Sequence, residues 1–224
     1  MSNIFIIPTP IGNLGDITYR AVETLKSVNK IYAEDTRTSK KLLSFYNIET
    51  KVYSYHQYNE HRIVDQIVKE VIDQDISIAL ISDAGTPGIS DPGFLLINRA
   101  KRIGVPVFCL PGATALIPAL VQSGFPSDEF YFFGFLPQKK GRKKKINLIL
   151  EKNSTIILYE SPHRLMKLLL EIKESDVNNR NISISREISK IHEESIKGDV
   201  DQMIKYFTQK PIKGEIVVVI DKID

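Results

Sequence analysis

The stretch that decides the fold is residues 82–93, which read SDAGTPGISDPG. It directly follows the apolar run Ile76–Ile81, and a helical pattern begins at Phe94. Three glycines and two prolines make this segment stiff, and they let a ligand approach the backbone closely. Asp83 and Asp91 could bind hydroxyl groups or a cation. We therefore expect a ligand-binding loop after a buried strand, although a long structural turn is the alternative.

The sequence around this loop alternates between two patterns. Short apolar runs at residues 4–7, 30–33, 52–55, 76–81 and 105–110 are separated by segments with helical spacing. This alternation is typical of a parallel sheet with helices on both faces. In such sheets, ligands bind beyond the carboxyl ends of the strands.

Two more segments rich in glycine or proline, residues 8–16 (PTPIGNLGD) and 111–114 (PGAT), also follow predicted strands. Neither contains the dinucleotide fingerprint G-x-G-x-x-G or the phosphate loop G-x-x-x-x-G-K-[ST]. The residues therefore disfavour NAD and ATP as ligands, but they do not name the ligand.

The second half of the chain has a different pattern. Strand patterns at residues 182–188 and 192–197 follow each other without a helix, which indicates antiparallel pairing. We predict an α/β protein of two domains: residues 1–115 with a parallel, Rossmann-like sheet, and residues 116–224 with a mixed sheet.

Composition narrows the class of protein. The 224 residues contain a single cysteine, Cys109, so no intrachain disulfide can form. Cys109 lies in an apolar run, and we expect it to be buried in a strand. No apolar run approaches the roughly 18 residues of a membrane helix, and the first residues do not resemble a signal peptide. We expect a cytoplasmic protein with no membrane segment.

Positive charge is concentrated in one segment. The formal net charge is +3, and residues 116–224 carry 18 basic and 15 acidic side chains. Six of the seven positions in 139–145 are Lys or Arg. Such a cluster favours partners that carry phosphate, and the alternative is a solvated loop.

Three polar clusters follow predicted strands and could form a site: Glu34-Asp35-Thr36-Arg37, then Glu160 with His163 and Arg164, and finally Arg186, Glu187 and Lys190. The first could equally cap a helix. The four histidines are scattered, and one cysteine cannot build a zinc site, so we expect no metal. The absence of a G-x-S-x-G elbow argues against a serine hydrolase.

Taken together, these segments resemble the tetrapyrrole (corrin/porphyrin) methylase superfamily. Within it, the chain is most similar to the enzymes that methylate a cytidine ribose in small-subunit ribosomal RNA. The resemblance rests on eight blocks in order: residues 8–18, 33–37, 82–93, 110–113, 134–137, 159–164, 185–187 and 214–215.

The resemblance implies a homodimer, and a cleft between the two α/β domains that binds S-adenosylmethionine. The cofactor contacts that it implies are Pro10, Asp83, Gly85, Thr86, Ser90, Pro111, Gly112, Ala113, Tyr159 and Gly214.

Two departures from the superfamily matter. Many members continue with helices beyond the last strand, and this sequence ends at Asp224. The corrin and porphyrin methylases have a glycine-rich first loop in place of PTPIGNL, which favours the RNA branch. We therefore expect 2′-O-methylation of a cytidine in small-subunit (16S) ribosomal RNA. C-methylation of a tetrapyrrole precursor is the alternative, and a non-catalytic RNA-binding module is a third possibility.

A neutral ribose hydroxyl is a poor nucleophile, so a base or a stabilising charge should assist the transfer. Our candidates for the base are Glu160, Asp35 and Glu187. Several basic side chains could contact the phosphate backbone of the RNA. They are Arg37, Arg164, Arg186 and Lys190, together with Lys143, Lys144 and Lys145 of the basic segment.

Overall fold

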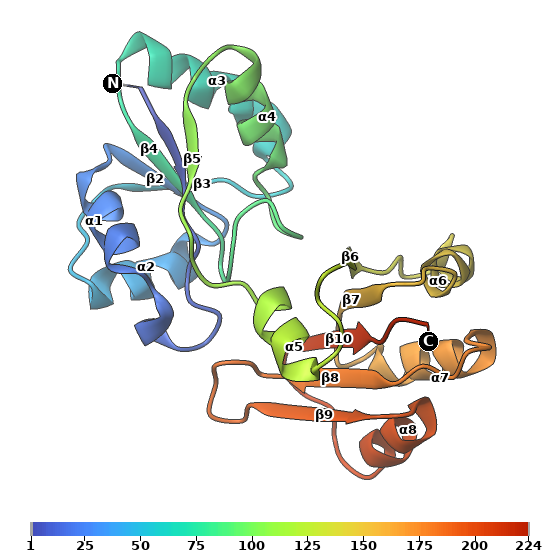
Figure 1. Cartoon of the computed structure of the whole chain (residues 1–224). Coiled ribbons are helices and arrows are strands. Elements are labelled where there is room, and N and C mark those ends of the chain that lie inside the picture. Colours follow the sequence, from blue (N-terminus) through green and yellow to red (C-terminus); the bar gives the residue numbers. More distant parts are fainter. Residues whose placement is uncertain (1, 224) are drawn as a thin grey trace. The chain divides into compact units, whose positions relative to one another are not determined.

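The computed structural model describes residues 2–223, and the chain divides into two compact units, Met1–Thr114 and Ala115–Asp224. Each unit has its own five-stranded sheet (Figure 1). The chain is thus an α/β protein with one parallel and one mixed sheet, which confirms the predicted fold class.

The first unit follows the predicted alternation. Its elements are β1 (Ile4–Ile6), the short 3-10 helix η1 (Leu14–Asp16), α1 (Tyr19–Ser27), β2 (Lys30–Ala33), α2 (Thr36–Phe45), β3 (Val52–Ser54), α3 (Glu60–Asp73), β4 (Ile78–Ile81), α4 (Phe94–Arg102) and β5 (Val107–Cys109).

The first sheet is parallel throughout, in the strand order β3-β2-β4-β1-β5. One face packs against α1 and α2, and the other packs against α3 and α4 (Figure 1). The central strand β4 is buried at all four positions, which explains why its sequence is a continuous apolar run.

The second unit contains α5 (Leu116–Ser123), β6 (Phe130–Phe135), α6 (Arg142–Leu150), β7 (Thr155–Glu160), α7 (Leu165–Ser175), β8 (Ile182–Arg186), β9 (Glu194–Gly198), α8 (Val200–Thr208) and β10 (Ile216–Ile220). The strand order is β6-β7-β10-β8-β9. Among the strands of residues 115–223, β6 and β7 pair in parallel, and the other three pairs are antiparallel.

The predicted antiparallel pair in this unit is confirmed as β8 and β9. The main core of the second unit lies between the sheet and the helices α6, α7 and α8. Helix α5 packs against β10, β8 and β9.

One expectation about the first unit is wrong. Cys109 is exposed rather than buried, because it ends β5, which lies at the edge of the sheet, next to β1. An apolar run of sequence does not distinguish an edge strand from a central one.

Among residues 2–223, no helix combines the length and the apolar character that crossing a membrane requires.

Candidate active site

The glycine- and proline-rich loops of the first unit meet at the carboxyl edge of its sheet. Thr9 and Gly85 exchange two backbone hydrogen bonds, each of 2.9 Å, and this ties the loop after β1 to the loop after β4. The Thr86 hydroxyl donates to the carbonyl of Ala113 at 3.1 Å. The third loop, which follows β5, is therefore held beside the other two.

Glycine at position 112 permits this close packing. A Cβ atom there would lie 2.7 Å from Cβ of Pro8, which is closer than side chains approach. Gly85 has φ +83°, a conformation that other residues adopt only with strain. The loops therefore need these two glycines in order to pack together.

The loop of residues 82–93 is held by its own polar groups. The Ser82 hydroxyl donates to the Gly85 carbonyl at 3.1 Å, and the Gly88 amide donates to the Pro92 carbonyl at 3.2 Å. Ser90 has φ +63°, which is a strained conformation for a residue other than glycine. Strain of this kind clusters in loops that clamp ligands.

Acidic side chains from two neighbouring strands meet beside this loop. The Asp35 amide donates to Asp83 Oδ1 at 3.1 Å, which links the end of β2 to the end of β4. Loss of solvation raises the pKa of Asp83. Burial, and then the charge of Asp83, raise the pKa of Glu34. Glu34 belongs to the cluster Glu34-Asp35-Thr36-Arg37, but it is not among the candidate bases predicted from the sequence. Its position directly after the predicted strand 30–33 could have indicated a role in the site.

Asp35 has the opposite electrostatic environment. Its carboxylate caps α2, accepting from the Arg37 amide at 2.8 Å, and it pairs with the Arg37 guanidinium at 2.7 Å. These bonds from Arg37 hold the pKa of Asp35 well below its usual range. Both expected roles, helix cap and charged site residue, are compatible with this geometry.

In the second unit, Glu160 ends β7 and is almost completely buried. Arg142 Nη2 lies 3.2 Å from its carboxylate, and Arg164 Nη2 lies 2.9 Å from it. The Ser161 amide also donates to it at 2.8 Å. This carboxylate is therefore already bonded by three donors.

Glu187 is held in a similar way. Its carboxylate accepts from Lys190 at 2.9 Å and from the Glu215 amide at 3.0 Å. The bond from Lys190 lowers the pKa of Glu187. A Cβ atom at Gly214 would lie 2.4 Å from this carboxylate, so any other residue there would force the Glu187 side chain to shift. Arg186, the preceding residue, pairs with Glu194 at 3.3 Å.

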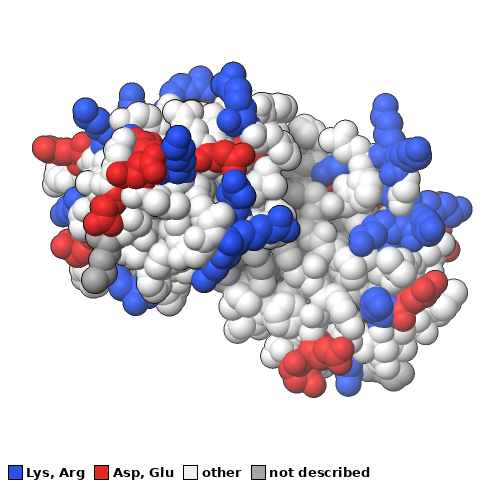
Figure 2. Space-filling model, turned by 90° about the horizontal axis from the view of Figure 1, so that it is seen from above, with Lys and Arg blue, Asp and Glu red and all other residues white. Residues whose placement is uncertain are grey.

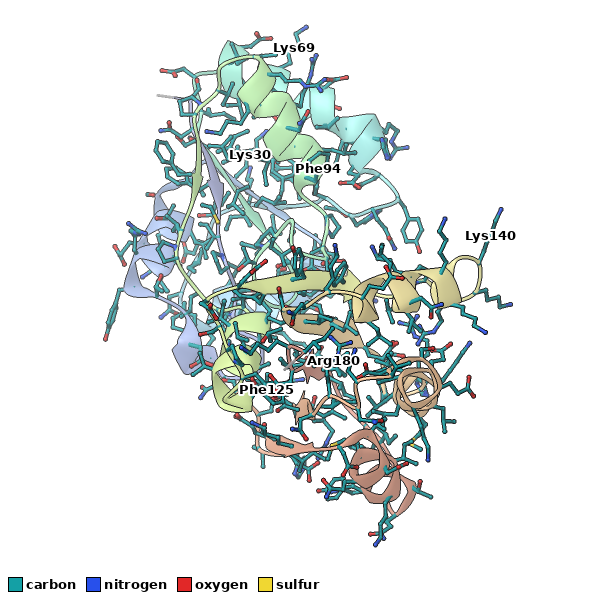
Figure 3. All side chains as sticks on the ribbon, turned by 45° about the vertical axis from the view of Figure 1, so that its right-hand side comes forward. Lys30, Lys69, Phe94, Phe125, Lys140 and Arg180 are labelled. Carbon is teal, nitrogen blue, oxygen red and sulfur yellow. The ribbon has the colours of Figure 1, made fainter. Side chains whose placement is uncertain are left out.

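The basic segment contains side chains of three kinds, and one of them, Lys145, is half-buried with its Nζ 4.8 Å from the centroid of the Phe133 ring. Lys139, Lys140, Lys143 and Lys144 are exposed, and Lys140 projects from the loop that leads into α6 (Figure 3). Basic side chains gather around this helix on the surface (Figure 2). Arg142, in contrast, is only 2% exposed, so it does not belong to the surface cluster.

The predicted cofactor contacts fall into two groups. Eight of them lie on the three linked loops of the first unit. Tyr159 and Gly214 lie in the second unit, where β7 and β10 pair with Tyr159 opposite Val217. The groups that these residues present suit S-adenosylmethionine. The Asp83 carboxylate can accept from hydroxyl or ammonium groups, Pro111 and Gly112 are exposed, and the cofactor has no phosphate that would need a cradle.

The sequence matches the family of Tetrapyrrole (Corrin/Porphyrin) Methylases over residues 3–204, and the chain belongs to this family. It is a methyltransferase, and the methyl donor of the family is S-adenosylmethionine.

Two relatives indicate which branch of the family this chain resembles. The chain is 43% identical over 222 residues to the ribosomal RNA small subunit methyltransferase I of Bacillus subtilis (strain 168), covering 99% of this chain and 75% of that protein. It is 40% identical over 220 residues to the protein of the same name from Thermotoga maritima, covering 98% of both.

The solved structures that resemble this chain show the fold alone. The uroporphyrin-III-C-methyltransferase of Thermus thermophilus has a TM-score of 0.70 at 15% identity, covering 100% of this chain and 96% of that one. A cobalt precorrin-4 methyltransferase has a TM-score of 0.67 at 15% identity, covering 97% and 94%.

Proposed function

We propose that this chain transfers a methyl group from S-adenosylmethionine to the 2′-oxygen of a cytidine ribose in small-subunit ribosomal RNA. The observation that carries the proposal is the near full-length identity, 40–44%, to proteins named ribosomal RNA small subunit methyltransferase I. A homodimer that acts on RNA or on the small ribosomal subunit in the cytoplasm completes the proposal.

The cofactor supplies an electrophilic methyl group, and the reaction is an in-line displacement at that carbon. The task of the protein is to align donor and acceptor, which can contribute several kcal/mol to lowering the barrier. Pro10, Gly85, Thr86 and Ser90 sit on loops rigid enough for that task. Asp83 would bind the hydroxyl or ammonium groups of the cofactor.

The choice of base is narrowed by the surroundings of each carboxylate. Asp35 and Glu187 have lowered pKa values, which makes them weak bases. Glu160 is bonded to two arginines. We propose that these three carboxylates mainly orient Arg37, Arg164 and Lys190 toward the RNA backbone. Glu34, whose pKa is raised, becomes a further candidate for the base.

The experiment is transfer of labelled methyl from S-adenosylmethionine to small subunits that lack the modification, with nuclease mapping of the product. We expect label at one cytidine 2′-oxygen. Cofactor binding without RNA labelling would contradict the proposal and favour a tetrapyrrole substrate. The likeness to the two tetrapyrrole enzymes does not favour that alternative, because at 15% identity it shows the fold alone.

A further inference from the structure

Three aromatic rings form a cluster on one face of the second sheet. The Tyr159 ring, on β7, packs edge-on against Phe132 at 5.0 Å and against Phe135 at 5.6 Å between ring centroids. Phe135 is 53% exposed, which is unusual for so large an apolar ring. Tyr159 thus lies between the other two rings, and Phe135, packed against it, offers a flat, apolar surface to solvent.

A bulge in β6 creates this cluster. Phe132 pairs with Ile157, and Phe135 pairs with Tyr159, so three steps along β6 match two steps along β7. Gly134 adopts φ +59° within the bulge. Without the extra residue, Phe135 would point to the opposite face, where Tyr131 and Phe133 stack on each other. The bulge therefore adds Phe135 to the face that carries Phe132 and Tyr159.

The segment that follows Phe135 is held firmly in place. Arg164 donates to the carbonyl of Leu136 at 3.4 Å, and Arg142 donates to the carbonyl of Pro137 at 3.3 Å. Both arginines also pair with the buried Glu160. After Gln138, the chain continues with Lys139 and Lys140. The buried ion pairs thus anchor the start of the basic segment beside the aromatic cluster.

We propose that Phe135, supported by Tyr159, is a stacking platform for an unpaired base of the substrate RNA, with Lys139, Lys140, Lys143 and Lys144 holding phosphates of the same strand. The inference rests on the proposed function, because it takes RNA as the substrate. Proteins that read single-stranded RNA combine such rings with cationic side chains. S-adenosylmethionine also carries a base but has no phosphate, so four adjacent lysines favour RNA as the occupant.

The test compares Phe135→Leu, which keeps an apolar side chain, with Phe135→Trp, which keeps a ring. Loss of one base–aromatic stack should weaken affinity for small subunits by about fivefold to a hundredfold. Phe135→Trp should restore it, and affinity for S-adenosylmethionine should not change. Tyr131→Leu is the matched control, because Tyr131 lies on the same strand, is 38% exposed and faces the other way. Its RNA affinity should equal that of the unmodified protein.

Subunit affinity, cofactor affinity and melting temperature are measured on the full chain. Normal subunit affinity in a folded Phe135→Leu variant would overturn the inference, and so would a loss confined to cofactor affinity. If the unaltered protein binds subunits but methylates none, the proposed function fails. In that case, the subunit affinities of the Phe135 variants alone test the stacking platform. If the unaltered protein binds no RNA, both fail.

Discussion

The guanidinium of Arg142 lies 3.2 Å from the carboxylate of Glu160, and neither side chain is more than 2% exposed. Arg142 Nε also lies 2.8 Å from Glu171 on α7. An arginine from the most basic segment of the chain is therefore part of the interior. It joins the start of α6 to the end of β7 and to α7.

The first prediction concerns this buried network. Arg142→Ala and Glu160→Ala should each lower the free energy of unfolding by up to about 3–5 kcal/mol, because each breaks a buried ion pair. Glu160 would keep Arg164 as a partner, and Arg142 would keep Glu171, so the loss should fall short of that of an isolated buried charge. The double variant should cost much less than the two single variants together. Denaturant unfolding measures all three.

The matched control for the network is Lys173→Ala, which removes an exposed ion pair with Asp201. It should cost less than about 1 kcal/mol. Equal losses from Lys173→Ala and Arg142→Ala would mean that burial does not matter here.

Glu160 can also be tested for its role in catalysis. Glu160→Gln keeps the shape of the side chain but cannot take up a proton. We expect turnover to fall more than cofactor affinity, because Arg164, 2.9 Å from the carboxylate, loses the negative charge that orients it. Turnover and cofactor affinity are measured separately, across a range of pH. Full turnover in a folded Glu160→Gln protein would exclude Glu160 as the base.

The second pair of variants tests the contact between Gly214 and Glu187. Gly214→Ala should place a methyl group 2.4 Å from the Glu187 carboxylate, displacing it and weakening cofactor binding. Gly104→Ala is the control, because Gly104 has a similar φ of +82° but no atom within 4 Å of the added Cβ. Both variants bear the cost of about 1–2 kcal/mol for an alanine in the left-handed region. Only Gly214→Ala should lose cofactor affinity in calorimetry, and equal losses would refute the prediction.

Opposite pH dependences are expected at Glu34 and Asp35. The folded-state pKa of Glu34 is raised, so its contribution to stability is present in acid and is lost as pH rises through that pKa. Glu34→Gln should therefore raise the melting temperature at about pH 7 more than at about pH 4.

Asp35 has a lowered pKa, so its contribution is present above the ordinary aspartate pKa and is lost as pH falls through the folded-state value. Asp35→Asn should lower the melting temperature near neutral pH, and the difference should shrink in acid. Melting curves of both variants, measured from neutral pH to below the ordinary aspartate pKa, provide the test. The same sign for both would show that the two carboxylates do not differ in environment.

The lysines of the first turn of α6 should determine how RNA affinity depends on salt. Neutralising Lys143, Lys144 and Lys145 to Gln should reduce the slope of log affinity against log salt by about 2, given about 0.7 per phosphate contact with single strands. The control triple of Lys51, Lys69 and Lys101, all exposed on the first unit, should leave the slope unchanged. An unchanged slope in the first triple would assign the phosphate contacts elsewhere.

Local patterns were sufficient to predict much of the fold. The alternation of apolar runs and helical spacing predicted the parallel first sheet, because each strand and each helix must bury its own apolar residues. The adjacent strand patterns near residues 182–197 predicted the antiparallel pair. The glycines and prolines of residues 82–93 predicted a rigid loop, since their conformational limits belong to the residues themselves.

Other features depend on partners that are distant in the sequence. Arg142 looks like its lysine neighbours in the sequence. Its charge is balanced in the interior by Glu160 and Glu171, which are 18 and 29 residues away. The exposure of Cys109 follows from the strand order, and the face of Phe135 follows from a single bulge. The sequence by itself determined the elements, the rigid loops and the family of this protein. Only the tertiary structure decided which charges are buried and which rings are exposed, because burial depends on neighbours that folding brings together.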